Sequence, residues 1–298
     1  MDPAYSVTGS NPGRRPRMIL AMTHPTVAVL GAGAIGEILA EGLLRAGWET
    51  EDIIMLERLE ERAREVERHT GIQVTLDPAV AVDGRDVIVV AVKPKDVGEL
   101  IAQIREAVKP NQVIVSLAAG VPLAVYERVF EDIAIVRAMP NTPAAVNEGM
   151  TAYCGGAHAD GDALALADMV LSAVGETISL SEDLLDAVTA VSGTGPAYVF
   201  LLAESLTEAA IREGLPHHAA EKLVVQTLHG AGALLTVSDK SAFRLRAEVT
   251  SPGGTTAAAL HELEEGGFRA LMERAVRSAA VRSRELGAIA LEKSNPAK

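Results

Sequence analysis

Short apolar runs alternate with amphipathic segments of helical length from Thr26 to about residue 180, and beyond that point the apolar runs cease. The run DVIVVAV (86–92) is almost wholly apolar, which is typical of a strand covered on both faces of a parallel sheet. Runs of this kind predict strands at 26–30, 53–56, 72–76, 86–92, 113–118, 134–139, 151–154 and 176–180. Because helical segments separate these strands, the pattern predicts an α/β fold with a Rossmann-like, doubly wound sheet.

The sequence after residue 182 contains only helical patterns. Pro196 and Pro216 fit the first turn of a helix, where a missing N–H group costs nothing. We therefore divide the chain into a dinucleotide-binding Rossmann domain at 25–182 and an all-α substrate and dimerisation domain at 183–298. The helices predicted in the second domain cover 183–190, 196–214, 216–235, 241–249, 255–266 and 268–287.

The predicted helix that begins at Pro196 is apolar on more than one face over the stretch YVFLLA. A helix of this kind must be buried on several sides, and a domain of this size offers few neighbours. The pattern favours burial against a second subunit, so we expect a homodimer as the minimal unit. A central helix in a monomeric bundle is the alternative.

Residues 1–24 are rich in Pro, Gly, Ser and Arg, and we expect a disordered leader or an over-long start. Met18 and Met22 are the alternative initiators. The apolar run MILAM within this segment is too short for an export signal. We find no run that approaches the roughly 20 apolar residues of a membrane span.

Charge and cysteine content narrow the function classes. The formal net charge of −13 disfavours nucleic acid and anionic membrane surfaces as partners. The single cysteine, Cys154, excludes an internal disulfide and a cysteine-based zinc cluster, and it fits a reducing, cytoplasmic setting. The seven histidines have no metal-ligand spacing, so we expect no metal site. Cys154 itself lies on a predicted strand and is interpreted as a small core residue.

The motif GAGAIG (31–36) follows the first strand and opens a helix. Its glycines have separate roles in a dinucleotide site: Gly31 permits the tight turn, Gly33 lets the pyrophosphate approach, and Gly36 lets helix and sheet pack closely. The pyrophosphate then lies on free N–H groups at the helix start. The predicted cofactor-binding residues of this motif are Gly31, Ala32, Gly33, Ala34, Ile35 and Gly36.

Glu57 and Arg58 end the second strand and give opposite indications about the cofactor. The carboxylate of Glu57 suits the ribose 2′-hydroxyl of NAD, whereas the guanidinium of Arg58 suits the 2′-phosphate of NADP. We favour NADP and retain NAD as the alternative.

Four further loops are candidates for binding. AVKPKDV (91–97) places Lys93 at the carboxyl edge of the sheet, where ligands of open α/β folds bind, and RAMPNTPAAVNEG (137–149) places Asn141 at the same edge. SGTGPAY (192–198) and SPGGTT (251–256) each combine glycines and hydroxyls directly before a predicted helix. Each of these two loops either presents N–H groups to an anion or is a simple helix cap.

The motifs GAGAIG, AVKP, SLAAGV (116–121), RAMPNTPA, AVSGTGPAYVF, EVTSPGGTT and LEEGGFR (263–269) occur in this order. Together they resemble pyrroline-5-carboxylate reductases, over residues 25 to about 287. The resemblance implies a Rossmann domain, a helical dimerisation domain, an active site between them and, in many members, assemblies of dimers. It also implies NAD(P)H-dependent reduction of 1-pyrroline-5-carboxylate to L-proline.

The resemblance assigns roles to individual positions. The cofactor would be held by residues 31–36, by Arg58, by Ala91, Val92, Lys93 and Pro94, and by Ala118 and Ala119. The substrate would be held by Val249, Gly253, Gly254, Thr255 and Thr256, and we add Asn141 as a candidate. The substrate carboxylate would lie on the N–H groups of residues 254–256. Thr256 would be the catalytic hydrogen-bond donor near the ring nitrogen while hydride reaches the imine carbon.

The sequence departs from the family pattern at several positions. Pro78 stands where Asn is common, Lys95 where Gln is common, and Ala247 where Asp is frequent. Residues 239–242 replace a typical Glu-x-His-Pro.

Two other functions are the alternatives. An imine or β-hydroxy-acid dehydrogenase would carry a lysine on the helix from Pro196, which has none. A dinucleotide-binding regulator without catalysis is disfavoured by the intact loops.

Overall fold

The computed structural model describes residues 24–293. The leader expected at 1–24 lies outside the described residues except for His24, whose ring stacks on Trp48 with the ring centroids 3.9 Å apart. Residues 294–298 also lie outside this range.

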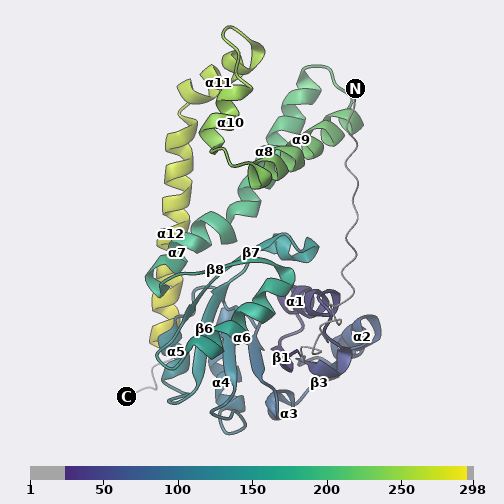
Figure 1. The fold of residues 1–298 in the computed structure, drawn as a ribbon, viewed down its shortest axis with the longest axis vertical. Helices are drawn as coiled ribbons and strands as arrows, with labels where there is room; N and C mark the ends of the chain where they lie inside the picture. Colours follow the sequence, from purple (N-terminus) through teal and green to yellow (C-terminus); the bar gives the residue numbers. More distant parts are fainter. Residues whose placement is uncertain (1–23, 294–298) are drawn as a thin grey trace, which may run out of the picture.

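An eight-stranded sheet with the order β3-β2-β1-β4-β5-β6-β7-β8 forms the first half of the molecule (Figure 1). All eight strands occur where the apolar runs predicted them. Most neighbours are parallel; β7 alone runs antiparallel to β6, and β8 is parallel to β7. The strands are β1 (Val27–Leu30), β2 (Ile53–Leu56), β3 (Gln73–Thr75), β4 (Val87–Val90), β5 (Val113–Ser116), β6 (Ala134–Met139), β7 (Gly149–Gly155) and β8 (Gly175–Ser179).

Helices cover both faces of the sheet and create two apolar cores. Helices α1 (Ala34–Arg45), α2 (Glu60–Thr70) and α6 (Gly161–Leu171) contribute to one core. Helices α3 (Pro78–Val82), α4 (Val97–Ile104) and α5 (Leu123–Glu127) contribute to the other. The doubly wound Rossmann-like fold is therefore confirmed. Cys154 is buried on β7, as its interpretation as a core residue requires.

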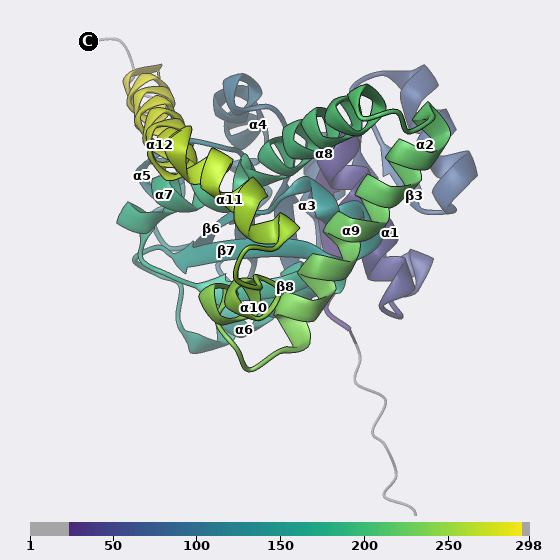
Figure 2. The same ribbon diagram turned by 90° about the horizontal axis from the view of Figure 1, so that it is seen from above.

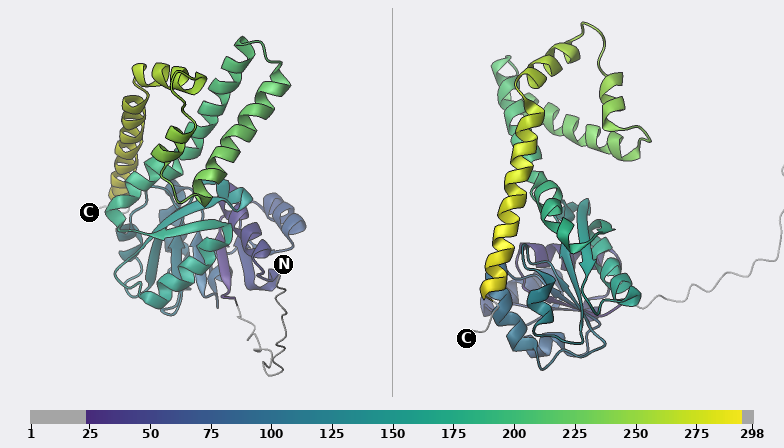
Figure 3. Two further views of the ribbon diagram at one scale, coloured as in Figure 1. Left: turned by 45° about the horizontal axis from the view of Figure 1, so that its top comes forward. Right: turned by 90° about the vertical axis from the view of Figure 1, so that its left-hand side faces the viewer.

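The second half is entirely helical among its described residues. It contains α7 (Leu185–Val188), the π-turn η6 (Thr189–Gly193), α8 (Gly195–Arg212), α9 (His217–Val237), α10 (Ala242–Glu248), α11 (Thr255–Glu265) and α12 (Phe268–Lys293). Helix α12 returns to the sheet domain, where Gly120 lies against Leu286 and Gly287. Figure 3 shows α12 running from the helical domain down to the sheet.

Neither interpretation of SGTGPAY, as a helix start that presents N–H groups to an anion or as a simple helix cap, agrees with the structure. Residues 189–193 form a π-turn that continues directly into α8. The N–H group of Thr194 donates to the carbonyl of Thr189 at 2.8 Å and is not available to a ligand. The two predicted helices at 183–190 and 196–214 therefore belong to one helical stretch.

Helix α8 is largely uncovered in the single chain. It packs on α9 but diverges from α12, as Figures 1 and 2 show. None of its residues is buried, and Phe200 and Leu201 are 66% and 62% exposed. A central helix in a monomeric bundle is therefore excluded.

The helical stretch Glu182–Arg212 contains a segment that is long and apolar enough, by length and composition alone, to cross a membrane. The expectation that no run of the chain approaches a membrane span is therefore wrong for this stretch. An assignment of this stretch as a membrane span would rest on length and composition alone, and core helices of soluble proteins satisfy the same two criteria. The apolar side chains of this stretch do require cover that the described chain does not provide.

The turn between β1 and α1 depends on two glycines. Gly31 has φ = +117°, and its N–H group donates to the carbonyl of Leu56 on β2 at 3.0 Å. A Cβ atom on Gly36 would overlap the carbonyl oxygen of Gly31. Only glycine therefore lets the first turn of α1 lie against the end of β1.

We predict that Gly36→Ala lowers the free energy of unfolding by about 1–3 kcal/mol, because the backbone must shift to admit the methyl group. Gly98→Ala is the matched control, since Gly98 lies in α4 and a Cβ atom there would meet no atom within 4 Å. The control should gain about 0.4–1 kcal/mol. Urea unfolding measures both, and equal values would contradict the packing argument.

Candidate functional site

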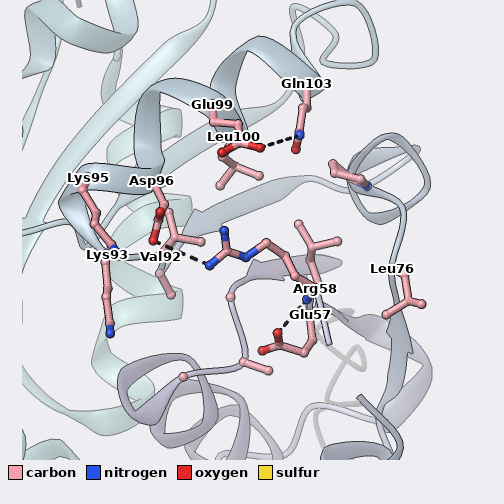
Figure 4. A pocket seen from close by; sticks show the side chains of 16 residues that line it. Glu57, Arg58, Leu76, Val92, Lys93, Lys95, Asp96, Glu99, Leu100 and Gln103 are labelled. Atoms are coloured by element: carbon pink, nitrogen blue, oxygen red, sulfur yellow. Dashed lines mark hydrogen bonds and ion pairs between the residues drawn. The ribbon is translucent and has the colours of Figure 1, made fainter. Parts of the chain in front are cut away.

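A cleft of about 400 Å³ lies at the carboxyl ends of β1, β2 and β4 (Figure 4). Parallel strands place their loops at this edge, so residues distant in sequence meet there. Eight of the predicted cofactor residues line the cleft: Gly31, Ala32, Gly33, Glu57, Arg58, Ala91, Val92 and Lys93.

The other six predicted cofactor residues lie beside the cleft lining. Ala34, Ile35 and Gly36 form the first turn of α1, whose N-cap, Gly33, makes no side-chain capping bond. Their N–H groups therefore lack intrahelical acceptors and face the position suited to an anion. Pro94 begins the short 3₁₀ helix η2 (Pro94–Asp96), and Ala118 and Ala119 follow β5 at the same edge.

The carboxylate of Glu57 accepts hydrogen bonds from the backbone of the next two residues. Its Oε1 accepts hydrogen bonds from the N–H groups of Arg58 at 2.6 Å and Leu59 at 3.0 Å. These bonds close the turn that leads into α2. One of the two oxygens of the carboxylate expected to receive the ribose hydroxyl of NAD thus has a structural role in this chain.

Arg58 extends its side chain toward Asp96 on the opposite wall, with 3.8 Å between the guanidinium nitrogen and the carboxylate oxygen (Figure 4). The Arg58 side chain is 70% exposed, so its charge is available to a ligand. This arrangement places a cation at the end of β2, where a 2′-phosphate binds in NADP-linked Rossmann folds.

Several lining residues were not predicted as site residues. Leu76 follows β3, and Asp96, Glu99, Leu100 and Gln103 lie on one face of η2 and α4. The spacing of three and four residues in this last group was the available signal, because it places side chains on one helical face. Pro78 and Lys95, noted only as departures from the family pattern, also line the cleft.

The predicted substrate residues other than Asn141 lie together in the loop between α10 and α11 and in the first turn of α11. Gly253 has φ = +69°, and Gly254 is the N-cap of α11 without a side-chain capping bond. The N–H group of Gly254 donates to the carbonyl of Ser251 at 3.0 Å. The expectation that this N–H group is free to hold a substrate carboxylate is therefore wrong. Among residues 24–293, the N–H groups of Thr255 and Thr256 have no recorded acceptor.

This loop lies at the end of the helical domain away from the sheet, as the right-hand view in Figure 3 shows. Helix α12 spans the separation: Phe268 follows α11, whereas Gly287 contacts Gly120 of the sheet domain, about 28 Å along the helix axis. The loop and the cofactor cleft of one chain are therefore far apart. The expected active site between the two domains is not assembled within a single chain.

Two family descriptions match the chain. "Pyrroline-5-carboxylate reductase dimerisation" matches residues 182–286, and "NADP oxidoreductase coenzyme F420-dependent" matches residues 26–120. A pyrroline-5-carboxylate reductase of Corynebacterium melassecola is 41% identical over 266 residues, covering 88% of this chain and 98% of that relative. The chain belongs to the pyrroline-5-carboxylate reductase family.

Solved structures of this reductase family have the same fold. A pyrroline-5-carboxylate reductase from Coxiella burnetii has a TM-score of 0.84 at 34% identity and covers 88% of this chain and 98% of its own. The pyrroline carboxylate reductase of Plasmodium falciparum, solved with NADP bound, has a TM-score of 0.80 at 28% identity, with 89% and 99% coverage. The all-α half is thus the dimerisation domain of the family.

Asn141 joins the two domains of this reductase chain. Its Oδ1 accepts from the N–H group of Met150 at 2.9 Å, and its Nδ2 donates to the carbonyl and hydroxyl oxygens of Ser192, both at 3.3 Å. The Ser192 carbonyl needs this donor, because Pro196 four residues later has no N–H group to offer. Both ends of the Asn141 amide are thus engaged by protein, and its contact with substrate stays a prediction.

The remaining polar groups of the junction do not form a nucleophile or metal site. Burial, together with the nearby carboxylate of Glu182, raises the pKa of the Cys154 thiol to about 11, so the thiol stays protonated at neutral pH. Arg137 pairs with the same Glu182 at 3.0 Å. Across residues 24–293, no group of three or more His, Cys, Asp or Glu side chains converges on a metal position.

We predict that Asn141→Ala destabilises the protein by about 1–3 kcal/mol, because it leaves the Met150 N–H group and the Ser192 carbonyl unpaired. The exposed Asn111, in the turn before β5, provides the control Asn111→Ala. Urea unfolding measures the stability, and hydrogen exchange at residues 189–195 should accelerate only in the Asn141 variant. Identical behaviour of the two variants would remove Asn141 from the domain junction.

Proposed function

We propose that this chain reduces 1-pyrroline-5-carboxylate to L-proline with NADPH as the hydride donor. Membership of the reductase family carries this proposal, since the 41% identical relative is covered over 98% of its length. The lone, buried thiol and the biosynthetic family also favour a cytoplasmic protein.

The residues of the cleft fit a dinucleotide. A Cβ atom on Gly33 would meet no protein atom within 4 Å, so the backbone there is open to close approach by a ligand. The N–H groups of Ala34, Ile35 and Gly36 at the start of α1 would hold the pyrophosphate. The bound nicotinamide supplies the hydride, and the chain supplies orientation, which is the protein's main share of such a reaction.

NADPH is favoured over NADH by the different states of Glu57 and Arg58. One oxygen of the Glu57 carboxylate, Oε1, accepts from two backbone N–H groups, whereas the exposed guanidinium of Arg58 lies at the cleft wall beside Asp96. A 2′-phosphate would gain a charge-assisted, bidentate partner in Arg58.

We predict that Arg58→Ala raises the KM for NADPH roughly 10- to 100-fold, the value of a hydrogen bond to a charged group, and leaves the KM for NADH nearly unchanged. Arg68→Ala, at the far end of α2, is the control and should change neither value. Steady-state assays with both cofactors measure the effect. Equal losses with NADPH and NADH would contradict a phosphate role for Arg58.

Two chains would complete each active site. The loop that carries Thr255 and Thr256 is remote from the cleft of its own chain, and the apolar surface of α8 lacks cover within the chain. Packing this surface against a second copy satisfies the buried-helix pattern and allows the loop of one protomer to face the cleft of the other. The substrate carboxylate would then lie on the N–H groups of Thr255 and Thr256. The Thr256 hydroxyl would donate to the ring nitrogen.

Complementation tests the activity and the shared site together. We predict that Thr256→Ala lowers kcat with pyrroline-5-carboxylate about 100-fold or more while NADPH binding persists. Gly33→Val should abolish cofactor binding, because the new side chain occupies the path of the pyrophosphate. A purified heterodimer of the two variants should recover about half of the wild-type activity, since one of its two sites is intact.

The outcomes separate the claims. Wild-type protein that fails to oxidise NADPH with this substrate would overturn the reaction. An active wild type with an inactive heterodimer would overturn only the sharing of residues between protomers.

A further inference from the structure

One carboxylate, that of Glu264, connects three helices of the dimerisation domain. Glu264 lies in the last turn of α11 and accepts hydrogen bonds from Arg269 of α12, with Nε–Oε distances of 3.0 and 2.9 Å and an additional contact from the terminal nitrogen at 2.7 Å. Arg246 of α10 donates to the same carboxylate at 3.2 Å. The Arg269 fork is bidentate, which fixes direction as well as distance.

The three helices connected in this way are those that present the candidate substrate loop. Helix α10 ends at Glu248, directly before Val249, and α11 begins at Thr255. The loop is thus suspended between two helices whose relative position depends on the Arg246–Glu264 contact. At its start, the Thr250 hydroxyl donates to the backbone carbonyl of Arg246 at 2.6 Å, which ties the loop to the same arginine.

A second set of charges stabilises the end of α10. Glu248 pairs with Lys240 at 2.9 Å and with Arg244 at 3.5 Å. Lys240 lies in the segment 239–242 that departs from the family pattern. The guanidinium of Arg246 also lies 5.5 Å from the ring centroid of Phe243. This cation–π contact orients Arg246 against its own helix, α10.

Apolar packing alone does not fix these helices. Neither α10 nor α11 contains a buried residue in the described chain. A cavity of about 390 Å³ lies among these helices, and it is lined by Arg246, Leu260, Leu263, Glu264, Phe268, Arg269 and Met272. The turn between α11 and α12 is Gly266–Gly267, with φ = +72° at Gly267, and supplies no side chain to stiffen it.

The two arginines stabilise the charged form of the Glu264 carboxylate. The hydrogen bond from Arg269 holds the pKa of Glu264 below its usual range, and Arg246 acts in the same direction. Exposed ion pairs contribute little to global stability, so their value here lies in the geometry they impose.

We propose that Glu264 is a positioning residue for substrate binding: by holding α10 and α12 against α11, it sets the direction of the Thr255 and Thr256 N–H groups without touching the substrate. This proposal rests on the proposed function of the 249–256 loop.

Glu264→Gln tests the proposal, because it removes the charge and keeps the shape. We expect kcat/KM for pyrroline-5-carboxylate to fall about 10- to 100-fold, the effect of a small displacement of an orienting group, and the KM for NADPH to stay within about twofold. Glu265→Gln is the matched control, since within residues 24–293 this neighbouring carboxylate pairs only with His261 of its own helix, at 3.6 Å. The control should behave as wild type.

Two further readouts distinguish positioning from general destabilisation. Added salt should raise the substrate KM of the wild type more than that of Glu264→Gln, because the variant has already lost the ion pairs of Glu264 that salt would screen. Arg246→Met, which keeps the aliphatic stem, should reduce kcat/KM on its own but add little to the effect of Glu264→Gln. Sedimentation checks that each variant keeps the wild-type assembly.

The proposal is overturned if Glu264→Gln and Glu265→Gln have the same kcat/KM for the substrate. It is also overturned if the KM for NADPH rises in parallel, since the effect would then be structural. A wild-type enzyme that is inactive with this substrate would instead overturn the proposed function.

Discussion

The contact between Gly36 and the carbonyl of Gly31 is the constraint on which the cofactor end of the molecule depends. It allows α1 to begin directly at the end of β1, so that the unpaired N–H groups of its first turn face the cleft. Glu57 and Arg58 then lie at the end of the adjacent strand, within reach of the same ligand. A side chain at either glycine would move the helix start and separate these groups.

The dimerisation domain is organised differently, because its helices do not form a complete apolar core within one chain. Helix α8 has apolar side chains and no buried residue, and α10 and α11 are held mainly by ion pairs. Such a domain acquires a defined interior only by association, which couples the oligomeric state to the geometry of the site. In the proposed shared site, association of this half would also bring the substrate loop of one protomer to the cofactor cleft of the other.

The sequence predicted most of the fold because buried strands and long helices leave strong local patterns. It failed at SGTGPAY, where Pro196 signalled a helix start although a π-turn had already continued the chain from α7. The helices α3 and α5 were too short to leave a periodic signal. The cleft wall formed by Asp96 and Gln103, and the use of Glu57 by its own backbone, depend on contacts that spacing alone does not encode.

Helix α12 also has a mechanical consequence. It is anchored where Gly287 meets Gly120 and free of the sheet domain at Phe268, so it acts as a lever about 28 Å long. A tilt of about 5° at the anchor moves the far end by roughly 2–3 Å, close to the length of a hydrogen bond. A small rotation of α12 on the sheet domain would therefore displace the substrate loop far enough to make or break its contacts.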